Sequence, residues 1–250
     1  MLSTNPSFYV NRAMARLKLA QWDGVIADSQ EAIRLKENNM KAWYNLAQAQ
    51  AAKGDMEEAV RSAIRAHQEC LREMREGGKG SSSLANITDL VLKCKKVRWE
   101  QLERQRLARL DGVVGEALRG LEARRDAKIQ EFINQGGEDI EQKVLQVRHE
   151  YEVMADDVRK AFELAGVGAA KRRAVPDWCI DDITFAIMVD PVVTKTGNSY
   201  ERASIMEHLK RSHTDPLTRE PLRPEDLRPN LALKQACEEF LEANGWAVDW

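Results

Sequence analysis

Residues 176–246 read PDWCIDDITFAIMVDPVVTKTGNSYERASIMEHLKRSHTDPLTREPLRPEDLRPNLALKQACEEFLEANGW, and this stretch decides the fold of the C-terminal part of the chain. Most of the prolines lie in it, and the apolar runs at residues 183–188 and 192–196 predict short strands. Residues 204–211 predict one helix, and residues 231–243 predict a closing helix. The pattern indicates a small α+β unit of roughly 75 residues, near the lower limit for independent folding.

Metal chemistry is disfavoured in this stretch. Its candidate ligands are Cys179, His208, His213 and Cys237. A zinc-binding RING needs eight ligands in paired spacing, and no C-x-x-C or H-x-x-x-H pair is present. The number of ligands would still allow one zinc site made of two Cys and two His. Cys179 has no neighbouring His to lower its pKa, so an inert thiol is favoured over a nucleophile. We therefore expect no metal and no cofactor.

The same stretch resembles the U-box family of ubiquitin ligases. The matching elements are Asp190-Pro191, Gly197, SYER at residues 199–202, DPLTR at residues 215–219, Pro221-Leu222 and PNLALK at residues 229–234. The resemblance implies a zinc-free, RING-like fold in which hydrogen bonds and salt bridges replace the metals. Candidates for those interactions are Asp190, Glu201, Arg202 and Asp215, with their pairing left open. Loss of one partner of such a buried pair is costly.

What the resemblance implies for function is an adaptor that recruits a ubiquitin-conjugating enzyme and forms no covalent intermediate with ubiquitin. Ile183, Phe185 and Pro216 match the positions that contact the conjugating enzyme. Arg219 matches the basic residue that bridges this enzyme and its attached ubiquitin. The alternatives are that Ile183 or Phe185 belongs to the core, that Pro216 only shapes a turn, and that Arg219 makes a surface ion pair.

The N-terminal part contains an internal repeat. A shift of 34 residues superimposes Tyr9 on Trp43, Ala13 on Ala47, Val25 on Ala59 and Ala32 on Ala66. This is the period of the tetratricopeptide repeat, a pair of helices in which small residues allow close approach. Two unrelated amphipathic hairpins are the alternative. We expect two repeats within residues 1–76, followed by a loop at residues 77–85 that contains GGKGSSS.

Over its whole length, the chain resembles the co-chaperones that combine tetratricopeptide repeats with a U-box. This resemblance implies a groove for the acidic C-terminal tails of cytosolic heat-shock chaperones. Asn11 and Lys41 match members of the clamp that grips the terminal carboxylate, and Asn45 lies at a concave position of the second repeat. Ser7 lies at a corresponding concave position. Such co-chaperones carry three repeats, and this chain begins where the second would begin. We therefore expect either a shortened N-terminus or an incomplete groove.

Residues 86–170 predict a long helical hairpin. Apolar residues recur at alternating spacings of three and four on both sides of a break at residues 134–139, which typifies a coiled coil. They are Leu107, Leu110, Val114, Ala117 and Leu121 before the break, and Ile140, Val144, Val147, Tyr151, Met154, Val158, Ala161 and Ala165 after it. A single hairpin buries this stripe only in part, which favours a homodimer over a spacer packed on the repeats.

Composition narrows the remaining possibilities. The net charge of −2 argues against broad binding to nucleic acid or membrane surfaces. No apolar stretch approaches the roughly 18 residues of a membrane span. Four scattered cysteines and an N-terminus without a secretory signal indicate a reduced protein of the cytoplasm or the nucleus. The segment 171–250, which contains the U-box, begins with the basic run KRR at residues 171–173. This run is either a nuclear-localisation fragment or solvated surface.

The expected fold is thus mostly α: tetratricopeptide repeats and a long hairpin, followed by a small α+β U-box. The expected function is ubiquitin transfer to chaperone-bound, misfolded clients for proteasomal degradation. Its partners would be a conjugating enzyme, ubiquitin, chaperone tails and a second copy of the chain. The alternative function is a non-enzymatic repeat scaffold whose C-terminal unit only dimerises.

Overall fold

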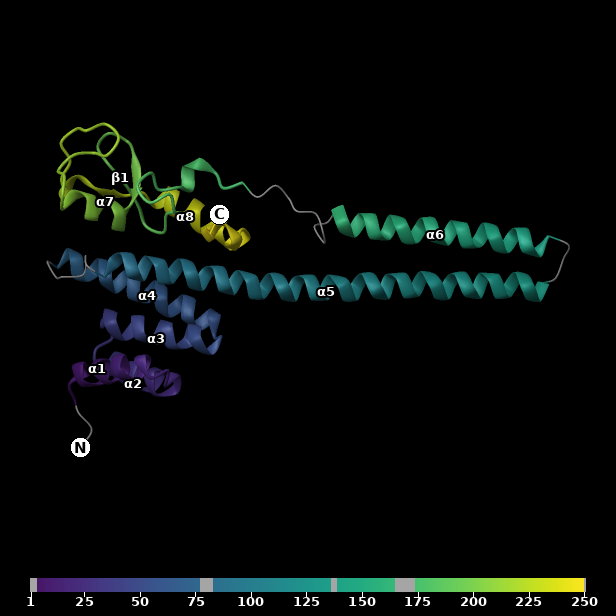
Figure 1. The fold of residues 1–250 in the computed structure, drawn as a ribbon, viewed down its shortest axis with the longest axis horizontal. Coiled ribbons are helices and arrows are strands. Elements are labelled where there is room, and N and C mark those ends of the chain that lie inside the picture. Colours follow the sequence, from purple (N-terminus) through teal and green to yellow (C-terminus); the bar gives the residue numbers. More distant parts are fainter. Residues whose placement is uncertain (1–3, 77–82, 136–138, 165–173, 250) are drawn as a thin grey trace. The chain divides into compact units, whose positions relative to one another are not determined.

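The computed structural model describes residues 4–76, 83–135, 139–164 and 174–249 (Figure 1). The chain divides into two compact units, one made of Met1–Glu100 with Val175–Trp250 and the other of Gln101–Ala174. In the described residues, no helix has the length and apolar character that a membrane crossing requires. Three predicted features fall wholly or partly outside the described residues: most of the 77–85 loop, the centre of the break at 134–139, and the basic run 171–173.

Four helices form the N-terminal repeats: α1 (Pro6–Lys18), α2 (Trp22–Leu35), α3 (Met40–Lys53) and α4 (Met56–Arg75). Most of the residues matched by the 34-residue shift pack between these helices. Tyr9 is buried, Trp43 is half-buried, and the remaining matched residues are fully buried: Ala13, Val25, Ala32, Ala47, Ala59 and Ala66. Small buried residues at repeat-related positions allow the helices to lie close together. The mostly helical, repeat-based fold predicted from the sequence is therefore confirmed.

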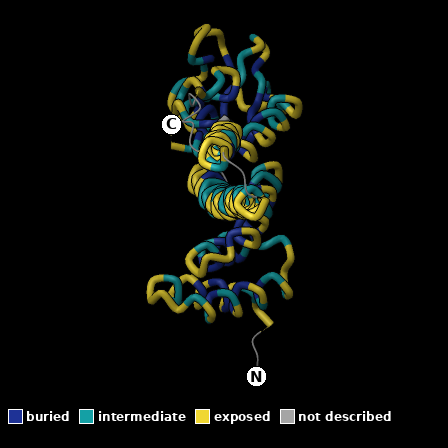
Figure 2. Tube along the Cα trace, turned by 90° about the vertical axis from the view of Figure 1, so that its right-hand side faces the viewer, coloured by how far each residue is buried: buried dark blue, intermediate teal, exposed yellow. Residues whose placement is uncertain are grey.

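Helix α5 (Leu84–Gln135) is 52 residues long, and α6 (Ile140–Leu164) runs beside its second half. Within the second unit, the two helices form the predicted hairpin. The described seam residues are half-buried for the most part, Val147 is buried, and Met154 and Ala161 are exposed. Figure 2 shows the same contrast, with buried segments in the repeats and the C-terminal part and few in the hairpin. Ala165 of the predicted seam lies outside the described residues.

The C-terminal part contains a three-stranded antiparallel sheet in the order β2-β1-β3. Its strands are β1 (Pro191–Val193), β2 (Ser199–Glu201) and β3 (Arg228–Pro229). Its helices are α7 (Arg202–Leu209) and α8 (Leu231–Ala243), with short 3-10 turns at Asp177–Cys179, Pro224–Asp226 and Gly245–Asp249. The closing helix has the predicted bounds. The predicted strand at residues 183–188 is wrong, because this segment forms a loop closed by a bridge between Ile180 and Ile187.

The first half of α5 joins the repeats to the C-terminal part within the first unit. Val91 and Leu92 share one apolar cluster with Ala63 of α4 and with Cys237 and Leu241 of α8. This shared core places the C-terminal part on the repeats rather than leaving it a separate domain.

A close contact at the end of α8 reinforces this packing. The Trp99 indole N–H donates to the carbonyl oxygen of Ala243 at 3.1 Å. A Cβ atom at Gly245 would lie 2.3 Å from Cβ of Trp99, so only glycine fits at this position.

Candidate functional site

Two loops of the C-terminal part share one construction, the first at residues 181–186 and the second at residues 215–220. Each begins with a buried aspartate, Asp181 or Asp215, whose N–H donates at 2.8 Å to the carbonyl oxygen five residues later. The residue four positions after each aspartate donates its N–H back to the aspartate carbonyl oxygen, at 2.7 Å from Phe185 and 2.9 Å from Arg219. Phe185 and Arg219 therefore occupy equivalent positions.

Both of these residues adopt a left-handed backbone conformation. The φ angle is 58° at Phe185 and 61° at Arg219. For a residue other than glycine, this conformation costs about 1–3 kcal/mol, and such strain gathers at functional sites. Both side chains are exposed, Phe185 to 70%. Strained backbone that presents an exposed phenylalanine and an exposed arginine marks this surface as the candidate site.

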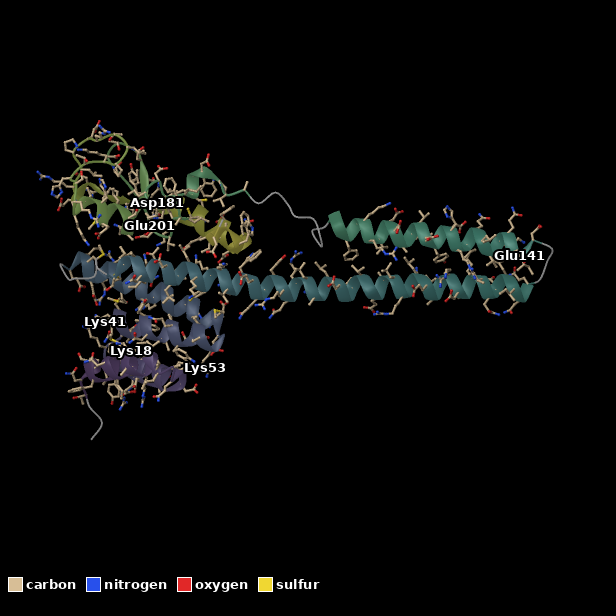
Figure 3. All side chains as sticks on the ribbon, viewed as in Figure 1. Lys18, Lys41, Lys53, Glu141, Asp181 and Glu201 are labelled. Carbon is tan, nitrogen blue, oxygen red and sulfur yellow. The ribbon has the colours of Figure 1, made fainter. Side chains whose placement is uncertain are left out.

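Asp181 organises the first loop through local backbone and one contact with β2. Its Oδ2 accepts from the N–H of Thr184 at 3.0 Å and from the hydroxyl of Thr184 at 2.7 Å. Its Oδ1 accepts from the N–H of Glu201 at 2.9 Å. In Figure 3, Asp181 and Glu201 lie next to each other. The sequence-based prediction missed Asp181, although the shared D-x-x-T spacing of residues 181–184 and 215–218 is a signal that could have found it.

Asp215 organises the second loop and ties it to the β1–β2 hairpin. Its Oδ1 accepts from the N–H groups of Leu217 at 2.9 Å and Thr218 at 3.1 Å, and from the hydroxyl of Tyr200 at 2.8 Å. The hydroxyl of Thr196 donates to Oδ2 at 2.8 Å. Burial opposes ionisation of Asp215, but these donors outweigh it and hold its pKa below the usual range. Burial and the bond to this carboxylate both raise the pKa of Tyr200.

Glu201 and Asp190 complete the polar framework. Glu201 Oε2 accepts from the N–H groups of Val189 at 2.7 Å and Asp190 at 2.9 Å, while Oε1 has no partner in the described part of the chain. Burial raises the pKa of Glu201. Asp190 pairs with Arg202 at 2.6 Å and with Lys234 at 3.4 Å. Of the four polar residues singled out in the sequence, Asp190, Glu201 and Arg202 thus belong to one connected network, whereas Asp215 belongs to another. The described residues contain no cluster of three or more His, Cys, Asp and Glu that could bind a metal.

Ile183 and Pro216 lie beside the two exposed loop residues but are half-buried. Ile183 packs against the core cluster that includes Tyr200 and Ile205. It also lines a cavity of ≈420 Å³ together with residues of α7 and α5, among them Thr88 and Asp89. Ile183 therefore contributes in part to the core, since one side of this residue faces the core and another faces a cavity. Leu217, an exposed residue next to Pro216, was not predicted.

None of the four cysteines offers a reactive thiolate. Cys70, Cys94, Cys179 and Cys237 are all buried. Burial raises the pKa of each thiol, to about 11 for Cys70 and Cys94 and to about 12 for Cys237. Because the thiolate is the nucleophilic form, these residues are poorly suited to forming a thioester with ubiquitin.

A separate groove of ≈710 Å³ lies between α3 and α5 in the repeats. Its lining includes Tyr44 and Gln48 of α3 with Asp89 and Lys93 of α5. The three predicted tail-binding residues are not among its lining residues. Asn11 and Lys41 are exposed, and Figure 3 shows Lys41 near the start of α3. Asn45 is buried, and its Nδ2 has no hydrogen-bond partner in the described residues.

Comparisons with known proteins agree with this architecture. Residues 175–246 match the family model of the U-box domain. The chain is 31% identical over 248 residues to "E3 ubiquitin-protein ligase CHIP" of Arabidopsis thaliana, covering 98% of this chain and 84% of that protein. It is 40% identical over 70 residues to "Ubiquitin conjugation factor E4" of Schizosaccharomyces pombe, covering 28% of this chain and 7% of that protein. It is 39% identical over 72 residues to "U-box domain-containing protein 12" of Oryza sativa, covering 28% of this chain and 12% of that protein.

Proposed function

The chain belongs to the family of CHIP-like U-box ubiquitin ligases, and from this premise we propose that it is a cytoplasmic adaptor that holds a ubiquitin-charged conjugating enzyme on its two loops. The observation that carries the proposal is the matched, strained presentation of Phe185 and Arg219. Phe185, Pro216 and the exposed side of Ile183 contact the conjugating enzyme. Arg219 bridges that enzyme and ubiquitin.

The proposed mechanism is positional. The planar guanidinium of Arg219 can donate several hydrogen bonds at once, which suits a residue that must contact two proteins. A conjugating enzyme and its ubiquitin held in one arrangement present the thioester near its attack geometry, which lowers the entropic part of the barrier. The buried, protonated thiols support a transfer that passes directly from the conjugating enzyme to the client amine, without a covalent intermediate on this chain.

Single-turnover discharge of ubiquitin from a charged conjugating enzyme tests this proposal. Ile183→Ala and Phe185→Ala should abolish stimulated discharge with the circular dichroism spectrum unchanged. Arg219→Ala should slow discharge more than it weakens binding of the uncharged enzyme. Arg223→Ala, which removes another exposed arginine of the same part, serves as the control and should leave discharge unchanged. Full activity in the Ile183 and Phe185 variants would refute the assignment.

We further propose that the repeats bind the acidic C-terminal tail of a heat-shock chaperone and so bring misfolded clients to the ligase. The unpartnered amide of the buried Asn45, one turn from Lys41 on α3, supports a carboxylate site there, with Asn11 contributing from α1. Calorimetry with a chaperone-tail peptide and its amidated form tests this proposal. Tail binding should weaken on Lys41→Ala and on amidation, and binding indifferent to both would refute the clamp.

Self-association through the hairpin is also proposed. Large apolar residues of the second unit remain exposed on both helices: Leu102, Val113 and Ile133 on α5, and Leu145, Val153 and Met154 on α6. A second copy of the hairpin would remove this surface from water, which is a common reason for exposed apolar residues on a helical hairpin. Sedimentation of the wild type and of Leu145→Asp should show a dimer that dissociates more readily in the variant.

A further inference from the structure

A third cavity, of ≈490 Å³, lies between the end of α4 and the edge formed by β3 and the start of α8. Both of its walls belong to the first compact unit. Its apolar lining includes Leu71, Met74, Met206, Leu227, Pro229 and Leu231. Leu231 is 73% exposed, the largest exposed fraction of any large apolar residue in the described part of the chain. Apolar surface of this kind, gathered in a cleft, is typical of a binding site.

The charged residues of this cleft give it a net positive character. Arg75 of α4 and Arg202 and Arg228 of the C-terminal part line it together with a single acidic residue, Asp190. The Asp190 carboxylate is already neutralised, because Arg202 lies 2.6 Å and Lys234 3.4 Å from its oxygens. The cleft therefore carries more positive than negative charge, although the whole chain has a net charge of −2.

Two of the arginines remain available to a ligand. Arg75 and Arg228 make no salt bridge with any carboxylate of the described residues, and both are exposed. Arg228 uses Nη1 to donate to the carbonyl oxygens of Glu225 at 2.6 Å and Leu227 at 3.2 Å. These bonds fix the orientation of the guanidinium, and its Nε and Nη2 have no partner in the described part. An arginine held in this way is prepared to donate to an incoming carboxylate at a lower entropic cost.

We propose that this cleft binds a short peptide segment of a partner protein that combines aliphatic side chains with carboxylates. The aliphatic side chains would cover Leu231 and the apolar floor, and the carboxylates would pair with Arg75 and Arg228. Charge complementarity favours an acidic segment over a basic or neutral one. The apolar floor favours a peptide over a free inorganic anion or a nucleic-acid backbone. The site is separate from the two loops and from the groove between α3 and α5, so it stands or falls independently of the proposed function.

Fluorescence polarisation with the whole chain tests this assignment. The probe is a fluorescein-labelled peptide, Asp-Glu-Leu-Leu-Asp-Glu, with an amidated C-terminus so that no terminal carboxylate can reach the proposed site at Lys41 and Asn45. It should bind saturably, and the affinity should fall by about tenfold or more with Arg75→Glu and with Leu231→Asp. The control Arg159→Glu, an exposed arginine of α6, should leave the affinity unchanged. A peptide with Ser in place of both Leu, and one with Lys in place of the acidic residues, should bind at least about tenfold more weakly.

Several outcomes would overturn the proposal. Absence of saturable binding, or equal affinity in wild type and Arg75→Glu, would show that the cleft is not the site. A loss of affinity on Lys41→Ala would place the peptide at the proposed tail-binding residues of the repeats instead. Dimerisation abolished by Leu231→Asp but not by Leu145→Asp would show that the cleft is occupied by a second copy of the chain. Since Arg75 and Leu231 are both exposed, the melting temperature of each variant should stay at the wild-type value.

Discussion

The first and second loops present Phe185 and Arg219 in the same backbone geometry, yet they reach it through different interactions. Asp181 accepts two hydrogen bonds from Thr184 and one from the backbone of β2. Asp215 accepts hydrogen bonds from the backbone of its own loop and also from the hydroxyls of Tyr200 and Thr196 in the β1–β2 hairpin. The first loop is thus held mainly by its own chain segment and the second by side chains far away in sequence. Equal geometry therefore does not mean equal sensitivity to mutation.

The largest expected effect follows from the difference between the two aspartates. Asp215→Ala would leave the fully buried Tyr200 hydroxyl and several other donors without an acceptor. Hydrogen bonds to a charged group contribute about 1.5–3 kcal/mol each, so the free energy of unfolding should fall by about 3 kcal/mol or more. Asp181→Ala should cost less, because it leaves no buried side-chain hydroxyl of a distant residue unpaired.

Urea unfolding of the two variants measures this difference. Tyr200→Phe provides the matched control, since it removes only the hydroxyl and should lower the free energy of unfolding by about 1–2 kcal/mol. Discharge activity should also fall in Tyr200→Phe, although the substituted side chain is buried. If Asp181→Ala and Asp215→Ala are equally destabilised, the two networks are equivalent and the distinction between the loops is wrong.

The sequence predicted the closing helix at residues 231–243 and the small residues that pack between the repeats, because both depend on local periodicity. It failed at residues 183–188, where alternating apolar residues imitate a strand. Ile183 faces the core and Phe185 faces solvent because of a left-handed residue in a loop, and no local pattern encodes that conformation. The core shared by α5 and α8 and the lining of the groove between α3 and α5 depend on contacts between distant segments.

Glycine substitutions at the two loop tips should separate stability from function. Glycine adopts a positive φ without the steric cost paid by other residues, so Phe185→Gly and Arg219→Gly should each gain up to about 1 kcal/mol of stability. If the two side chains contact the conjugating enzyme and ubiquitin, both variants should nevertheless lose at least about tenfold in the rate of ubiquitin discharge. Arg219→Gly removes charge-assisted hydrogen bonds, and Phe185→Gly removes an apolar contact of comparable free energy.

Melting temperature and single-turnover discharge, measured on the same preparations, decide this prediction. Gly54, the αL residue that ends α3, supplies a comparison in the opposite direction, since Gly54→Ala should lower stability. A glycine variant that is stabilised and fully active would show that the strain at that loop tip serves no contact.

The smallest expected effect concerns pH, and it has opposite signs for the two acidic groups next to the loops. Asp215 has a lowered pKa in the folded state, so its contribution to stability is complete above the ordinary aspartate value and is lost as the pH falls through the folded pKa. Glu201 has a pKa raised above 4.5 by burial, so the folded state binds its proton more tightly than the unfolded state does. Stability should therefore decrease as the pH rises from about 4.5 through the folded pKa of Glu201.

Glu201→Gln isolates this second contribution. The amide keeps an oxygen that can accept from the N–H groups of Val189 and Asp190, but it does not titrate. As the pH is raised from about 4 to about 8, the stability of wild type should therefore fall relative to that of Glu201→Gln. The difference in free energy of unfolding between the two proteins should become constant above the folded pKa of Glu201. Urea unfolding at a series of pH values measures it. Parallel curves for the two proteins would mean that the unpaired Oε1 of Glu201 is solvated in the folded state and that this carboxylate, unlike Asp215, carries no pH-dependent share of loop stability.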